Sequence, residues 1–121
     1  MVDQSRTGRD RDKVGPIVSS AHLAQGGFPA LSEVEFGLIL AQHGFNRWMV
    51  RCMAATGVGG LAPLDVLVLH TVAHRKRAKK QADVCLVLNV EDTHTVAYAI
   101  RKLEKLKLVK SRRVGKEKVV E

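Results

Sequence analysis

Two histidines have a spacing at which metal ligands could stand. His70 and His74 are four positions apart, which places both imidazoles on one face of a helix. No third ligand adjoins them in the sequence. We therefore expect two partly exposed histidines near a helix end, and no metal site.

The two cysteines, Cys52 and Cys85, are too few for a disulfide framework. Cys85 occupies a small-residue core position of a predicted helix, so packing is favoured there over redox sensing. Cys52, near Trp48, is the better candidate for a sensor, although packing is favoured there too. The chain shows no nucleophile with its base, no phosphate loop and no carboxylate pair in a recognisable setting. We expect neither an enzyme nor a cofactor.

The basic side chains offer a different chemistry, and they are unevenly placed. The formal net charge is +8. Residues 1–74 hold six Lys or Arg and six Asp or Glu, whereas residues 75–121 hold fourteen basic and six acidic residues, so the whole excess lies in the C-terminal part. A nucleic-acid face would produce this asymmetry, because neutralised phosphates release counterions. A solvated lysine-rich surface explains the charge alone equally well.

A helix predicted over residues 92–107 lies inside this basic segment. Asp92 can cap it by accepting from backbone N–H groups. Its apolar stripe is expected to be buried, and at about 100° per residue the stripe fixes the opposite face. The stripe consists of Val96, Ala99, Ile100 and Leu103. The outward face consists of His94, Tyr98, Arg101 and Lys105, flanked by Ala97 and Lys102.

The outward residues at the start of this helix suit contacts with DNA bases. Thr93, His94 and Thr95 stand at the helix N-terminus, where base edges are reached and the helix dipole attracts phosphate. Tyr98 could donate to a phosphate or pack on a thymine methyl.

The basic residues further along divide into two roles. Arg101 suits a bidentate contact with guanine or a phosphate clamp. Lys102 and Lys105 are expected to position the helix on the DNA backbone, not to read bases.

After this helix the chain is predicted to form a β-hairpin over residues 110–121, with a turn at Gly115 and Lys116. A hairpin in this place would act as a wing, laying Arg113 and Lys116 along the DNA backbone or into the minor groove. The hairpin carries four basic residues, which are Arg112, Arg113, Lys116 and Lys118.

The N-terminal part is predicted to hold an arm and a long helix. Residues 1–30 mix Gly, Ser, Asp and Arg without periodicity, which predicts a mobile arm. The helix is predicted over residues 31–57, with a capping box of Ser32 and Glu35 at its start and the glycine-rich stretch 56–60 at its end.

An apolar seam runs along this helix, which is too long for the core of a small domain to cover, so part of the seam should meet a partner subunit. The seam consists of Val34, Leu38, Ala41, Phe45, Trp48 and Cys52. We assign dimerisation to Leu38, Phe45, Trp48 and Cys52. An effector pocket could use some of the same side chains, namely Phe45, Trp48, Met49 and Met53, but a dimer core is favoured.

Two shorter helices are predicted between the long helix and residue 92. Pro63 suits the first turn of one, which ends near His74. Residues 76–81 form a charged connection, and a helix over residues 82–88 leads to a tight link in which Asn89 can be left-handed. The core face of the first is Leu64, Leu67, Val68, Thr71 and Val72, and that of the second is Val84, Cys85 and Leu88.

The order of these elements predicts the fold class. It is mostly α with a small β-hairpin, a winged helix-turn-helix over residues 61–121 preceded by a long N-terminal helix. Two helices joined by a short turn, the second with a polar and basic outer face, place that helix in the DNA major groove. We expect sequence-specific binding of double-stranded DNA. The alternative is a winged helix used for protein assembly or for nonspecific nucleic-acid binding.

Several segments carry a resemblance to a known family. They are 61–65 (LAPLD), 92–96 (DTHTV) and 103–109 (LEKLKLV), and they resemble the MarR family of winged-helix regulators over roughly residues 31–121. Segments 67–75 (LVLHTVAHR) and 88–94 (LNVEDTH) are closest to a proteobacterial MarR-like subgroup.

The resemblance implies a homodimeric regulator on a pseudo-palindromic operator, often a repressor and sometimes released by a small aromatic effector. It places DNA contacts on Thr93, His94, Thr95, Tyr98, Arg101, Arg113 and Lys116.

Three features depart from the family pattern. Ala62 stands where the family has a hydroxyl cap, at a cost of about 1 kcal/mol. Lys107 stands at a usual glycine position, so it must be left-handed or the helix must end differently. The chain reaches Glu121 in the second wing strand, where the family continues into one or two dimerisation helices. We therefore expect either a truncated form or a first helix that dimerises alone.

The apolar pattern also bears on location. No apolar run approaches the roughly 18 residues of a membrane span. The N-terminal residues carry charges of both signs and no apolar signal region. We expect a soluble, cytoplasmic protein.

Overall fold

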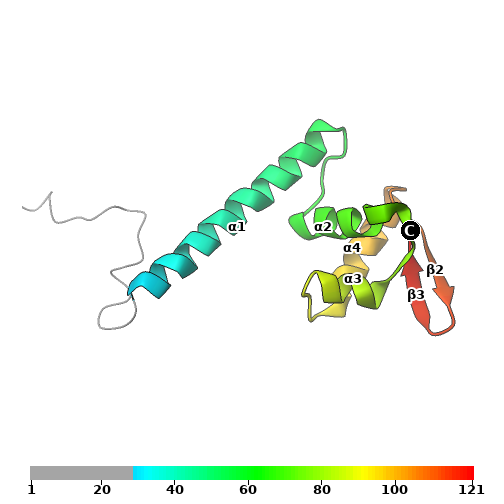
Figure 1. Ribbon diagram of the computed structural model, residues 1–121. Helices are drawn as coiled ribbons and strands as arrows, with labels where there is room; N and C mark the ends of the chain where they lie inside the picture. Colours follow the sequence, from blue (N-terminus) through cyan, green and yellow to red (C-terminus); the bar gives the residue numbers. More distant parts are fainter. Residues whose placement is uncertain (1–28) are drawn as a thin grey trace, which may run out of the picture. The chain divides into compact units, whose positions relative to one another are not determined.

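The computed structural model describes residues 29–121, so nearly all of the arm predicted over 1–30 lies outside the described residues. The chain divides into two compact units, and the second begins at Phe45. The helices are α1 (Pro29–Ala55), α2 (Pro63–Ala73), α3 (Gln81–Val87) and α4 (Thr93–Lys105), with a 3₁₀ turn at His74–Lys76 (Figure 1). The strands are β1 (Lys79–Lys80), β2 (Ser111–Val114) and β3 (Glu117–Val120). This confirms the predicted fold class.

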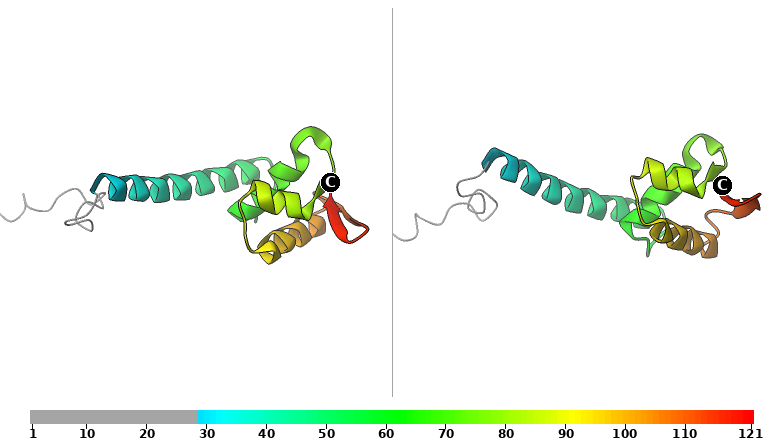
Figure 2. Two further views of the ribbon diagram at one scale, coloured as in Figure 1. Left: turned by 60° about the horizontal axis from the view of Figure 1, so that its bottom comes forward. Right: turned by 90° about the horizontal axis from the view of Figure 1, so that it is seen from below.

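Helix α1 is uninterrupted in both views of Figure 2. It begins at Pro29, before the predicted capping box, so the prediction of Ser32 as the cap is wrong. Proline suits the first position of a helix because its missing N–H would have had no partner there. The predicted end is confirmed, since Gly57 has φ +91° and Val58 N–H donates to the Met53 carbonyl at 3.0 Å.

The core of the second unit lies among α2, α3 and α4. The predicted stripe of α4 is wholly buried, as are Val84 and Cys85 of α3. Of the face predicted for α2, Val68 and Val72 are buried and the other three residues are half-buried. Leu61, Val109 and Val120 complete the cluster, which brings the loop before α2 and the last strand into contact with the helices.

A three-stranded antiparallel sheet in the order β1-β3-β2 follows the helices. The predicted hairpin is confirmed, with Ser111 opposite Val120 and Gly115 at φ +63° as the first residue of a two-residue turn. It extends away from the helices of its unit (Figure 2). The prediction of a plain connection over 76–81 is wrong at Lys79 and Lys80, which pair with β3.

Helices α3 and α4 end in the same way as α1, although neither has a glycine there. Asn89 has φ +53°, as predicted, and Val90 N–H donates to the Cys85 carbonyl at 2.9 Å. Lys107 has φ +59°, and Leu108 N–H donates to the Leu103 carbonyl at 3.0 Å. The first alternative for Lys107 is therefore confirmed: it takes the left-handed conformation that usually requires glycine.

Candidate nucleic-acid interface

The start of α4 is fixed by its predicted cap. His94 N–H donates to Asp92 Oδ1 at 2.9 Å, and Thr95 Oγ1 donates to the Asp92 carbonyl at 2.7 Å. The side chains of Thr93, His94 and Thr95 are exposed around this end. The Thr93 hydroxyl and the His94 imidazole are therefore exposed at this end of the helix, beside the Asp92 carboxylate, where a base edge can approach.

The outward face of α4 is exposed as predicted, at His94, Tyr98, Arg101 and Lys105. Tyr98 is 66% exposed. Within residues 29–121, neither Arg101 nor Lys105 forms an ion pair. The face therefore presents two unpaired cations beside an aromatic ring, a combination that can serve both phosphates and base edges.

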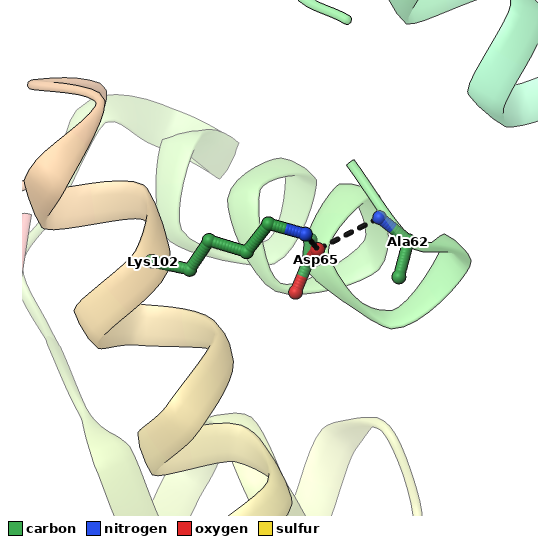
Figure 3. Close-up of polar contacts among 3 residues, drawn as sticks. All are labelled: Ala62, Asp65 and Lys102. Carbon is green, nitrogen blue, oxygen red and sulfur yellow. Dashed lines mark hydrogen bonds and ion pairs between the residues drawn. The ribbon is translucent and has the colours of Figure 1, made fainter. Parts of the chain in front are cut away.

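Lys102 differs from the other predicted contacts on α4. It is half-buried, and its Nζ lies 2.7 Å from Oδ2 of Asp65, as Figure 3 shows. Asp65 belongs to the first turn of α2, and its side chain is only 5% exposed. The Lys102 amine is thus directed into the protein.

The wing carries its cations outward and is tied to α4 by its other residues. Arg112, Arg113 and Lys116 are exposed. Ser111 Oγ donates to Glu104 of α4, and Lys118 lies 3.9 Å from the same carboxylate. The hairpin is therefore joined to α4 through Ser111 and Lys118, while Arg112, Arg113 and Lys116 face solvent.

A groove of about 420 Å³ joins the two predicted contact elements on this side. It is lined by Thr93 at the start of α4 and by Arg113 and Lys116 of the wing. These residues were predicted to contact DNA from two separate elements, and the groove brings them together. The remaining lining residues are Lys80, Gln81, Ala82, Cys85, Glu117 and Lys118. Lys80 and Gln81 were not predicted to belong to the site, because they lie in and next to strand β1, which the sequence did not indicate.

A second groove, of about 370 Å³, lies on the opposite side of α4. His94, Thr95 and Tyr98 line it from α4. Ala62, Leu64, Asp65 and Lys102 complete its lining. The first groove thus meets α4 only at Thr93, whereas the second runs along one side of the helix and includes the Asp65–Lys102 pair.

The residues weighed for other chemistry lie elsewhere. His70 and His74 are exposed, as predicted, and line a cavity of about 260 Å³ with Asp83. No three His, Cys, Asp or Glu side chains gather closely enough to hold a metal ion anywhere in residues 29–121. Cys85 is buried, which confirms the packing prediction, whereas Cys52 is exposed, so its predicted packing is not found within the described chain. None of the described helices is long and apolar enough to cross a membrane.

The residues assigned to dimerisation are all exposed on α1. Leu38, Phe45 and Trp48 are 65%, 54% and 59% exposed, and Cys52 is exposed too. The rings of Phe45 and Trp48 stack with their centroids 5.6 Å apart. Met49, in contrast, is buried, and Met53 packs against the core of the second unit. The seam therefore lies on a face of α1 that the described chain leaves open.

Comparison with protein families agrees with this geometry. Residues 61–120 match the family described as winged helix DNA-binding domain. These residues form a winged helix domain. The match covers α2, α3, α4 and the sheet, and so includes both grooves. Domains of this family typically do not catalyse reactions. No curated protein and no solved structure matches the chain.

Proposed function

We propose that the chain is a sequence-specific transcription regulator that binds double-stranded DNA with α4 in the major groove and the wing beside it. The observation that carries this proposal is the groove shared by Thr93, Arg113 and Lys116. It aligns the start of α4 with the wing cations, next to the exposed face of that helix. A duplex lying along this surface would meet base-reading and phosphate-binding groups together.

The proposed contacts divide by their chemistry. Thr93, His94, Thr95, Tyr98 and Arg101 read base edges, because they surround the start and the outward face of α4. Lys105 of α4 and Arg112, Arg113 and Lys116 of the wing bind phosphates, because their cations are exposed.

The proposed regulator is a homodimer, repressor-like and of the MarR type, in which residues 1–30 are an arm, 31–57 the dimerisation helix and 61–121 the DNA-binding domain. The exposed seam of α1 supports the dimer. The repressor-like action and the small aromatic effector rest on the sequence resemblance, and they stay predictions.

The experiment starts by selecting a preferred duplex from a randomised library. Affinity is then measured by fluorescence anisotropy for that duplex and a scrambled one over a range of salt. Arg101→Ala should reduce the preference for the selected duplex by the equivalent of about 1–3 kcal/mol. Lys116→Ala should weaken both duplexes alike and flatten the salt dependence by about one unit of slope.

Arg47→Ala is the matched control, because it removes the same charge from an exposed position on α1. It should change neither quantity. Equal affinity for every duplex would contradict sequence-specific regulation and favour nonspecific nucleic-acid binding. No binding even at low salt would favour a protein-assembly module.

A further inference from the structure

Asp65 joins two parts of the winged helix domain through one oxygen. Its Oδ2 accepts from the backbone N–H of Ala62 at 2.7 Å and from Lys102 Nζ at 2.7 Å (Figure 3). The first bond is one half of a capping box: the Asp65 side chain satisfies the Ala62 N–H, while the alanine side chain offers no acceptor to the N–H groups at the start of α2. The second reaches across to α4, 37 positions further along the chain.

A carboxylate as buried as Asp65 needs a partner of opposite charge, because removing one member of a buried pair leaves an uncompensated charge. Within residues 29–121, Lys102 is the cation that forms an ion pair with Asp65. The short distance and the burial of the carboxylate indicate that the amine stays in this pair, where an approaching phosphate would meet the negative charge of Asp65 as well as the amine.

Lys102 also has a counterpart on the opposite flank of α4. Glu104 is two residues further, which is about 200° around the helix axis. It binds Ser111 and Lys118 of the wing. One flank of α4 is therefore tied to α2 and the other to the wing, which fixes the rotation of the helix about its own axis. That rotation determines which side chains face the DNA.

We infer that Asp65 is a positioning residue for the recognition helix, and that Lys102 serves this pair and does not bind DNA. The inference rests on the proposed function, since it concerns how α4 presents His94, Tyr98 and Arg101 to a duplex. It assigns a role to an acidic residue outside the predicted interface, and it removes one lysine from the predicted phosphate contacts.

The test compares Lys102→Met with Lys105→Met, because both substitutions remove one lysine charge from the second half of α4. Affinities for the selected and the scrambled duplex are measured over a range of salt. Lys105→Met should lower the slope of log K against log salt by about 0.9 and weaken both duplexes alike. Lys102→Met should leave the slope unchanged and reduce the preference for the selected duplex about tenfold. This is the loss expected when one base contact is poorly formed.

Asp65→Asn removes a negative charge from the domain, whereas Lys102→Met removes a positive one. Asp65→Asn releases the Lys102 amine, so binding to the scrambled duplex should tighten while the preference falls. Lys102→Arg keeps a cation beside Asp65 and should retain most of the preference. The comparison of Lys102→Arg with Lys102→Met decides the matter if Asp65→Asn does not fold.

The outcomes distinguish a failure of the inference about Asp65 and Lys102 from a failure of the proposed DNA binding. If Lys102→Met lowers the salt slope as much as Lys105→Met does, Lys102 contacts a phosphate and the inference is overturned, whereas DNA binding stands. The inference would also be overturned if Lys102→Met kept the full preference for the selected duplex over the scrambled one. If the unmodified chain binds no duplex, the proposed function itself fails.

Discussion

The amine of Lys79 holds together the segment between α2 and β1. It donates to the carbonyls of Val72 at 2.9 Å, His74 at 2.5 Å and Arg77 at 2.9 Å. The last carbonyls of a helix have no partner within it, and here one cation serves several of them. Arg75 and Lys76 are left-handed, with φ of 58° and 48°. They lie between the carbonyls of His74 and Arg77, which the Lys79 amine holds together.

We therefore expect Lys79→Met to lower the free energy of unfolding by about 2 kcal/mol, since hydrogen bonds to a charged group are lost and their carbonyls are left partly buried. Thermal unfolding followed by circular dichroism measures this. Lys76→Met is the control, because Lys76 is exposed and its side chain makes no hydrogen bond or ion pair within residues 29–121. Equal losses in the two variants would show that the Lys79 bonds do not stabilise the turn.

At this scale, local chemistry was predictable and distant pairing was not. The Asp92 cap and the outward side chains of α4 follow from their own helix, so the sequence sufficed for them. The partner of Lys102 is 37 residues away, and no local spacing indicates it. Asp65 did carry one signal, because an acid at the third position of a helix that begins with Pro63 is placed to cap it.

At the scale of elements, α4 ends on a residue poorly suited to its conformation. Lys107 has φ +59°, where a β-carbon costs energy. Lys107→Gly should raise the free energy of unfolding by about 1 kcal/mol, after allowing for the extra freedom that glycine has in the unfolded chain. Chemical denaturation measures the gain.

Asn89→Gly serves as the control for Lys107→Gly, because Asn89 ends α3 in the same conformation at φ +53°. Asparagine tolerates this region better than lysine does, so its gain should be smaller. A loss of stability in Lys107→Gly would show that the lysine side chain itself contributes to the end of α4.

The short strand β1 is joined to β3 by an ion pair at its edge. Lys80 Nζ lies 2.8 Å from the Glu117 carboxylate, and this hydrogen bond raises the pKa of Lys80. A raised pKa means that the stabilising effect is complete below the ordinary lysine pKa and disappears as pH rises through the value in the folded protein.

Lys80→Met should therefore lower the melting temperature slightly at about pH 7 to 9, and the difference from the unmodified protein should disappear as the pH rises past the ordinary lysine pKa and through the raised pKa of Lys80. The expected effect is small because both side chains are about half exposed. Scanning calorimetry at these pH values would show it. A difference that stays constant over the whole range would assign the effect of Lys80 to its packing and not to its charge.

The elements themselves were largely predictable, with exceptions that have physical reasons. Long amphipathic helices and a hairpin with a glycine turn have strong periodic signals. Strand β1 has two residues, both lysines, so no alternation of apolar and polar side chains could indicate it. The start of α1 was misplaced because a proline at the first helical position competes with a capping box a few residues later.

At the scale of the whole molecule, the exposed seam of α1 raises the question of a second copy. A line of large apolar side chains on a surface helix costs free energy unless it is covered. A two-fold dimer would let the same face cover itself, and it would place two recognition helices on half-sites separated by about one helical turn of DNA.

Two leucines of α1 allow this idea to be tested within one helix. Leu38 lies on the predicted seam, whereas Leu40 lies about 200° away, and both are exposed. Leu38→Glu should convert a dimer into a monomer in light scattering, because it places a charge in the apolar contact. Leu40→Glu introduces the same charge and should leave the dimer intact. The monomer should bind a single half-site almost normally and lose the tighter binding to paired half-sites. An unmodified protein that is monomeric at high concentration would contradict the dimer, and equal dissociation in both variants would place the contact on another face of α1.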